Sequence, residues 1–129
     1  MGGIFAIAAA LQKTDLVKGL VLIATSGGIN LDRFQVQDWR QLYRQEYLES
    51  PDWFVTTKVD YEEFLSTIEV ETLLIWGDQD SVSPIEVGQY LNQILKKSKL
   101  YIVEGGDHGL AKQDADEVAI QINAYLKMI

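Results

Sequence analysis

Residues 70–84 read VETLLIWGDQDSVSP, a run of apolar side chains that ends abruptly in a polar turn. The run from Val70 to Trp76 has the length and aliphatic content of a strand. The turn after it holds Asp80. Ser83-Pro84-Ile85-Glu86 then supplies a capping hydroxyl, a proline at the first helical position and a glutamate at the third. We therefore expect a strand, a tight turn and a helix that runs to about Lys97.

Two further apolar runs flank this strand. Residues 17–25 read VKGLVLIAT, a nearly continuous aliphatic run that predicts a parallel strand covered on both faces, and Leu100 to Val103 forms a shorter run. Gly2 to Lys13 carries apolar residues with alanines between them, which predicts a helix buried on most of its surface, with no visible capping residue. Asp114 to Glu117 caps a final helix, whose apolar face holds Val118, Ile122, Tyr125, Leu126 and Ile129. This order predicts an α/β protein in which about three parallel strands are joined by right-handed crossovers and covered by helices.

Residues 29–68 differ in character from these runs. Their aromatic side chains lie among many charges at spacings typical of short helices, and Pro51 is expected to interrupt them. The aromatic set comprises Phe34, Trp39, Tyr43, Tyr47, Trp53, Phe54, Tyr61 and Phe64. We interpret residues 28–68 as a helical insertion into a single domain that covers residues 1–129.

The composition restricts the possible partners. A length of 129 residues with 47% hydrophobic side chains suits one core, and the net charge of -8 argues against nucleic acids and anionic membranes as partners. With no cysteine and one histidine, we expect no metal site and no cofactor. No apolar stretch approaches the roughly 20 residues that span a membrane. No basic segment precedes the N-terminal apolar run, so we expect a cytoplasmic protein.

His108 is the only histidine, and it follows the third apolar run directly after Gly105-Gly106-Asp107. Asp80 and His108 thus each follow a strand, and parallel sheets bind ligands at the carboxyl ends of their strands. A carboxylate can fix the tautomer of an imidazole, which can then accept the proton of a hydroxyl nucleophile. The two residues therefore predict two members of a catalytic triad.

Each of these residues also has a structural interpretation, because an aspartate in a glycine turn more often caps the turn than catalyses a reaction. Asp78 is expected to form such a turn, and Asp107 to be a solvated neighbour or a charge that acts on the imidazole. Ser26 lies beside a double glycine but lacks the glycine two positions before it that a nucleophile turn requires, so we do not expect it to be the nucleophile. The ordered occurrence of Asp80 and His108 at successive strand ends favours catalysis.

The pattern Gly77-x-x-Asp80-x-x-x-Pro84, followed by Gly105-x-x-His108, resembles the acid and histidine loops of the alpha/beta hydrolases. Met1-Gly2-Gly3 is similar to the end of that family's Gly-x-Ser-Met-Gly-Gly elbow, so the resemblance covers nearly the whole chain. It implies a partial alpha/beta-hydrolase fold, with Asp80 as the triad acid, His108 as the base and the backbone N–H of Met1 as an oxyanion donor. It also places residues 28–68 where related hydrolases carry a cap over the active site.

The resemblance implies a hydrolase that acts by acyl transfer on a small ester, lactone or similar carbonyl substrate. No Gly-x-Ser-x-Gly motif occurs in the sequence. We therefore expect the C-terminal half of such an enzyme, beginning just after the nucleophile and inactive alone. An exposed sheet edge at Val17–Thr25, or the helix Gly2–Lys13, predicts a homo-oligomer. One alternative is a non-catalytic, self-associating interaction module. A receiver-like domain is a weaker alternative, because three strands are too few for it and the acid lies late in the chain.

Overall fold

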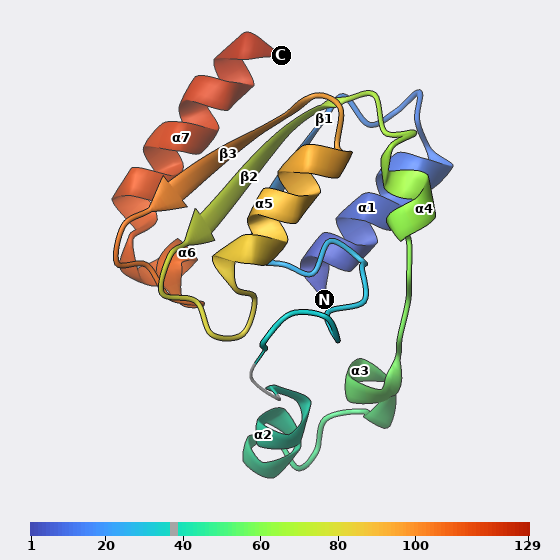
Figure 1. Ribbon diagram of the computed structural model, residues 1–129, viewed down its shortest axis with the longest axis vertical. Coiled ribbons are helices and arrows are strands. Elements are labelled where there is room, and N and C mark those ends of the chain that lie inside the picture. The colour runs from blue at the N-terminus through green and yellow to red at the C-terminus, as the bar shows by residue number, and fades with distance from the viewer. Residues whose placement is uncertain (37–38) are drawn as a thin grey trace.

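The computed structural model describes residues 1–36 and 39–129, and three parallel strands form its sheet (Figure 1). The strands β1 (Gly19–Ile23), β2 (Glu71–Gly77) and β3 (Ser98–Val103) lie in the order β1-β2-β3. β2 is central, and its Leu74 pairs with Leu22 of β1 and Leu100 of β3. The predicted α/β class with three parallel strands is confirmed.

Helices cover both faces of the sheet and fill the connection between β1 and β2. Their bounds are α1 Gly2–Gln12, α2 Trp39–Glu46, α3 Asp52–Thr56, α4 Glu62–Leu65, α5 Ile85–Ile94, α6 Leu110–Gln113 and α7 Ala115–Met128. Side chains of α1, α4 and α5 pack on one face, and those of α6 and α7 pack on the other. The part of the chain that runs from α2 through α3, residues 39–56, lies apart from the sheet at the bottom of Figure 1 and is called the α2–α3 segment below.

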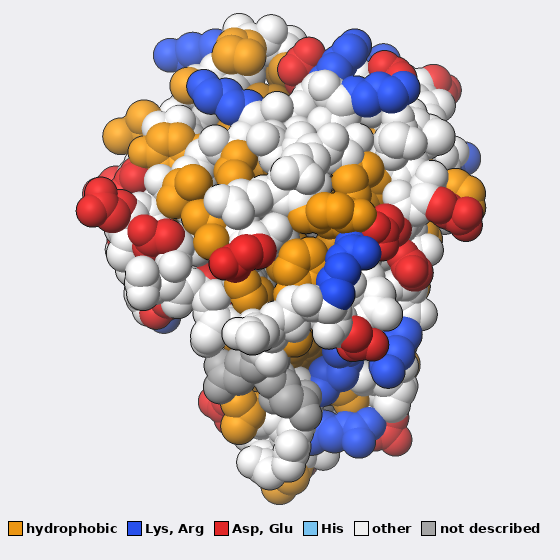
Figure 2. Space-filling model, in the orientation of Figure 1, with side chains coloured by type: hydrophobic (Ala, Val, Ile, Leu, Met, Phe, Trp, Pro, Cys, Tyr) orange, Lys and Arg blue, Asp and Glu red, His pale blue; other side chains and the backbone are white. Residues whose placement is uncertain are grey.

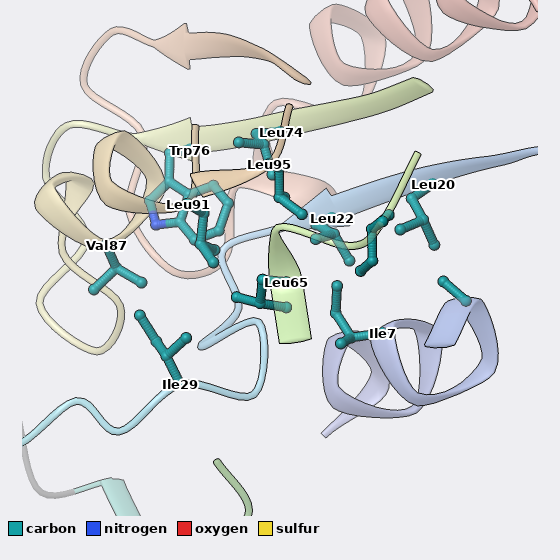
Figure 3. Close-up of a cluster of buried hydrophobic side chains, with 12 residues drawn as sticks. Ile7, Leu20, Leu22, Ile29, Leu65, Leu74, Trp76, Val87, Leu91 and Leu95 are labelled. Carbon is teal, nitrogen blue, oxygen red and sulfur yellow. The ribbon is translucent and has the colours of Figure 1, made fainter. Parts of the chain in front are cut away.

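The larger core lies between the sheet and helices α1, α4 and α5 (Figure 3). Ile7 of α1, Leu65 of α4 and Leu91 of α5 are buried in it, together with Leu22 and Trp76 of the sheet. Burying one such aliphatic side chain contributes about 1.5–3 kcal/mol relative to leaving it in water. This core fixes β2, and with it the turn that follows β2.

A smaller core covers the opposite face of the sheet. Ile75, Val103 and Leu110 are fully buried there, and Val118 and Tyr125 of α7 pack against them. β2 is therefore buried on both faces, because side chains of the covering helices pack on each side of this central strand. β1 alternates between buried and half-buried residues. Leu20 and Leu22 lie in the larger core, and Val21 and Ile23 pack against the smaller one, so the predicted cover of β1 is only partial on that second face.

The prediction that α1 is buried on most of its surface was wrong. Only Ile7 and Ala10 of α1 are buried, because this helix turns one side toward the sheet and leaves the rest at least partly exposed. In α7, Leu126 is 55% exposed and Ile129, just after the helix, is 49% exposed. Apolar spacing predicts which side chains share a helix face but not how far the neighbouring element extends over that face.

The helix after β2 ends earlier than predicted, at Ile94 rather than Lys97. Leu95 adopts extended backbone angles and is buried, and Ser98 already pairs with Thr72 as the first residue of β3. The chain therefore leaves the helix to bury Leu95 and to begin β3 two residues before the predicted Leu100.

The connection between β1 and β2 contains short helices, as its aromatic spacing predicts. α3 begins directly after Pro51, and α4 returns to the larger core through Leu65. Gln37 and Asp38, which belong to the predicted insertion, lie outside the described residues. Within the described part of the chain, no helix is long and apolar enough to cross a membrane.

Candidate active site

The turn after β2 holds the carboxyl group of Asp80 in a buried position. Its Oδ1 accepts hydrogen bonds from the backbone N–H groups of Val82 and Ser83, each at 2.8 Å. The Asp80 side chain is 0% exposed, so these two donors replace the water that burial removes. Because both donors bind Oδ1, the second oxygen, Oδ2, is left to face another partner.

Ser83 does not cap the following helix, so the prediction of a Ser83–Glu86 capping arrangement was wrong. Pro84 occupies the N-cap of α5, and no side chain caps that helix. The Ser83 hydroxyl instead donates to the carbonyl oxygen of Thr25 at 3.1 Å, and the Ser83 carbonyl accepts from Nε1 of Trp76 at 3.0 Å. The Ser83 hydroxyl thus bonds to Thr25, which is distant in the sequence, rather than to the start of the helix that the sequence pattern suggests.

The loop after β3 is held against the turn after β2. Gly105 has a φ of 74°, which favours glycine, and its N–H donates to Oδ1 of Asp78 at 2.8 Å. Gly77 approaches Gly106 so closely that a Cβ atom on Gly77 would overlap the Gly106 carbonyl. Asp78, which the sequence predicts to form its own turn, therefore links the two loops.

The two loops bring Asp80 and His108 together. Nδ1 of the imidazole lies 2.9 Å from Oδ2 of the buried carboxyl group, and the histidine side chain is 49% exposed. An ionised carboxylate can only accept hydrogen bonds, so this contact favours the tautomer with a proton on Nδ1 and leaves Nε2 as an acceptor. The Asp107 side chain bonds within its own loop, where its Oδ1 accepts a hydrogen bond from the N–H of Gly109 at 2.8 Å.

The first residues of the chain lie against the end of β1. A Cβ atom on Gly3 would overlap the side chain of Thr25, so glycine is required there. The Met1 carbonyl accepts hydrogen bonds from Ile4 and Phe5 and begins α1. Burial lowers the pKa of the Met1 amino group, because it removes the charged form from water. Thr25 thus contacts this N-terminal turn and, through its carbonyl, the turn that carries Asp80.

The end of β1 takes part in this arrangement, which the sequence does not indicate. Ala24 has a φ of 45°, a left-handed conformation that costs a residue with a Cβ atom about 1–3 kcal/mol. Its N–H still bonds to the Ile75 carbonyl at 3.0 Å, so the bend comes after the last bond to β2. The double glycine that follows marks a turn, but nothing in the sequence indicates that Thr25 meets Ser83, which is 58 positions away.

Two clefts lie in and beside the α2–α3 segment, and neither is lined by Asp80 or His108. The smaller has a volume of about 230 Å³, and the larger, of about 610 Å³, is lined in part by Arg40, Arg44 and Lys58. Basic side chains are visible at the lower right of the surface in Figure 2. Across residues 1–36 and 39–129, no group of three or more His, Cys, Asp or Glu side chains could hold a metal ion.

Known proteins share parts of this sequence. The profile of the TAP-like protein family matches residues 39–128. The chain is 36% identical over 59 residues to the non-heme chloroperoxidase CPO-A1 of Kitasatospora aureofaciens, a match that covers 45% of this chain and 22% of that protein. It is 35% identical over 51 residues to the pimeloyl-(acyl-carrier protein) methyl ester esterase of Neisseria meningitidis, which covers 40% of this chain and 20% of the esterase.

Solved structures share its fold over almost its whole length. An alpha/beta hydrolase enzyme, MGS-MChE2, from the sediment metagenome of the Mar Chica lagoon matches 98% of this chain at a TM-score of 0.76 and 21% identity. A thermophilic esterase from Thermogutta terrifontis matches 99% at a TM-score of 0.78 and 16% identity. The chain covers 57% and 62% of those two chains. Since the family profile matches well over half of the chain and the fold agrees with it, this protein belongs to the TAP-like family of the alpha/beta hydrolases.

Proposed function

We propose that this chain supplies the acid and the base of a serine-type hydrolase that acts by acyl transfer on a small ester, lactone or similar carbonyl substrate. The observation that carries the proposal is the 2.9 Å contact between Nδ1 of His108 and Oδ2 of Asp80. The imidazole is about half exposed while its carboxyl partner is shielded from water. This suits a base that must reach a reacting group and an acid that acts through the base.

The proposed chemistry moves one proton. Asp80 keeps the imidazole proton on Nδ1, so Nε2 accepts the proton of a hydroxyl nucleophile as its oxygen bonds to the substrate carbonyl carbon. Asp80 stabilises the resulting imidazolium, and Nε2 returns the proton to the leaving alcohol as the bond to that alcohol breaks. We assign the N–H of residue 1, when it is part of a peptide bond, as a donor to the oxyanion, and one such donor lowers the barrier by about 3–4 kcal/mol.

The nucleophile is the part that these residues do not supply. The sequence has six serines and no Gly-x-Ser-x-Gly motif. We propose that the isolated polypeptide is inactive, because a triad without its nucleophile loses activity on the order of a millionfold. Treatment with a fluorophosphonate probe is expected to leave the intact mass unchanged. An adduct on one serine that disappears in His108→Ala would overturn the proposed inactivity.

A fusion tests the proposed activity itself. The preceding half of a curated relative, ending in its nucleophile motif, is joined to Met1, and hydrolysis of p-nitrophenyl esters of increasing acyl length is measured. We expect His108→Ala and Asp80→Ala to lower kcat about 10⁴-fold or more, and the exposed substitution Asp116→Asn on α7 to leave it unchanged. A folded fusion that hydrolyses none of the esters would reject the substrate class. Equal activity in all variants would reject the roles of Asp80 and His108.

We also propose that residues 28–68 form a cap-like insertion that selects the substrate within one domain spanning residues 1–129. The connection leaves the sheet after the carboxyl end of β1, the edge at which Asp80 and His108 follow β2 and β3. Leu48 and Trp53 in the α2–α3 segment are 85% and 53% exposed. Such side chains suit an apolar wall for a carbonyl substrate. An esterase acting on a methyl ester stands among the relatives and supports this substrate class.

A second candidate function is that of a non-catalytic, self-associating interaction module. β1 lies at one edge of the three-stranded sheet, and Phe5 on α1 is 58% exposed. Unpaired strand edges and exposed apolar side chains favour association between copies. Sedimentation at micromolar concentration is expected to show a dimer or larger assembly, and a stable monomer would remove this candidate.

Cytoplasmic location stays a prediction that cell fractionation can test.

A further inference from the structure

Ser83 makes hydrogen bonds to three different parts of the molecule. Its N–H donates to Oδ1 of Asp80 at 2.8 Å, its hydroxyl donates to the Thr25 carbonyl at 3.1 Å, and its carbonyl accepts from Trp76 at 3.0 Å. Ser83 is only 2% exposed, so these protein partners take the place of water. One residue thus contacts the proposed acid, the end of β1 and the indole ring in the larger core.

We propose that Ser83 is a positioning residue, whose hydroxyl bond to Thr25 holds Asp80 in the place where it contacts His108. The proposal rests on the proposed function, because it concerns the same acid–base pair. The position of Ser83 just before Pro84 suggests a helix cap, whereas the proposal gives its side chain a role in positioning the acid.

The position of the Asp80 carboxyl group depends on the main chain around it. Both N–H donors to Oδ1 of Asp80 come from residues 82 and 83, so the carboxyl group follows any movement of that main chain. No side chain caps α5 at Pro84. The bonds from Ser83 Oγ to Thr25 and from Trp76 to the Ser83 carbonyl tie residue 83 to the chain just after β1 and to β2.

At the other end of this link, Thr25 lies against the N-terminal turn. The side chain of Thr25 lies so close to Gly3 that a Cβ atom on Gly3 would overlap it. The path from Asp80 through Ser83 and Thr25 therefore reaches the N-terminal turn, where we assign the oxyanion donor. A link of this kind fixes the spacing between the acid–base pair and that turn, and a misplacement of about 1 Å can lower a rate about 10²-fold.

The test uses the fact that His108 is the only histidine of the chain, so that NMR spectra of ¹⁵N-histidine-labelled protein report one imidazole. We expect the wild-type chain to show a strongly downfield proton on Nδ1, shared with Asp80. Ser83→Ala keeps both N–H donors and removes only the hydroxyl. We expect the downfield resonance to broaden or vanish in Ser83→Ala, and to remain in the control Ser66→Ala, which alters an exposed serine after α4.

A folded Ser83→Ala chain with an unchanged resonance would overturn the proposal. If Ser83→Ala does not fold, the same resonance is measured in Ser83→Cys, because a thiol has a shape similar to that of the hydroxyl group and is a weaker hydrogen-bond donor. A weakened resonance in Ser83→Cys supports the link, and a wild-type resonance overturns it. In the fusion described above, Ser83→Ala should lower kcat about 10²-fold with little change in KM. A fusion that is inactive throughout, while the resonance still responds to Ser83→Ala, would reject the proposed function and leave the positioning role standing.

Discussion

The sheet and the α2–α3 segment are stabilised in different ways. Residues 72–77 of β2 are all buried, whereas α2 has no buried residue and α3 has one, Val55. Contacts between rings hold the α2–α3 segment together, with Trp39 and Tyr43 lying 6.1 and 4.8 Å from the Phe54 ring. Asp80 and His108 follow strands of the well-buried part. The proposed acid–base pair thus follows strands of the well-buried sheet, whereas the α2–α3 segment has few buried residues.

Three residues join the two regions at the base of the connection. Arg33 forms an ion pair with Glu62 at 2.8 Å, and its guanidinium lies 4.2 Å from the centre of the Tyr90 ring. The Tyr90 hydroxyl also bonds to Glu62. Because Arg33 precedes the α2–α3 segment, Glu62 follows it and Tyr90 belongs to α5, this cluster fixes both ends of the connection to the larger core.

The largest difference between the two regions is expected from leucine truncation. Leu74 of β2 is 0% exposed and Leu42 of α2 is 49% exposed. Leu74→Ala should lower the free energy of unfolding by about 2–5 kcal/mol, because it removes buried methyl groups and leaves a cavity. The matched variant Leu42→Ala should change it by less than about 0.5 kcal/mol. Urea denaturation of both variants measures these values, and equal losses would contradict the contrast.

A smaller effect is expected from the ring cluster. Phe54→Ala removes the ring that contacts Trp39, Tyr43 and Trp53. Ring pairs contribute about 0.5–1.5 kcal/mol each beyond their burial. We expect faster amide hydrogen exchange in α2 and α3, with unchanged exchange in β2. Exchange that accelerates equally in the strand would show that the α2–α3 segment and the sheet unfold as one unit.

The smallest effect is expected from the cluster that joins the regions. The hydrogen bond from Arg33, and after it that from Tyr90, lowers the pKa of Glu62 below its usual value of 4.5. A lowered folded-state pKa contributes stability above the unfolded pKa, and that contribution is lost as the pH falls through the folded value. Glu62→Gln should therefore lower Tm slightly at neutral pH and match the wild-type chain in strong acid.

The neighbouring Glu63→Gln provides the control for this comparison, because Glu63 lies exposed on the same helix. It should leave Tm close to the wild-type value at neutral pH. If Glu62→Gln lowers Tm by the same amount in strong acid as at neutral pH, the carboxylate charge is not the cause of the lower Tm.

Much of the sheet could be predicted because its signals are local. The apolar run before Gly77 identifies β2, and the polar turns after the strands place Asp80 and His108 at one edge. Their contact at 2.9 Å fits the pairing that the order of the motifs suggests, and its catalytic role stays a prediction. The strand and the two turns need no information from distant residues, whereas the contact itself depends on β2 and β3 lying side by side.

The features that could not be predicted depend on distant partners. The Ser83 hydroxyl bonds to Thr25 rather than to the helix it precedes, because folding brings the end of β1 to it. Asp78 bonds to Gly105 for the same reason. The early end of α5 follows from the burial of Leu95, and the exposure of Leu126 follows from the limited extent of the neighbouring surface. A helical or turn pattern cannot report any of these contacts.

The claim that Asp80 and His108 share a proton is tested most directly by measuring the protonation of the imidazole in the chain of 129 residues. In ¹⁵N-histidine NMR spectra we expect Nδ1 of His108 to carry a downfield, slowly exchanging proton, and Asp80→Asn to abolish that signal while the fold persists. A rapidly exchanging imidazole whose spectrum is the same in the wild-type chain and in Asp80→Asn would show that the two side chains share no proton, and would contradict the account.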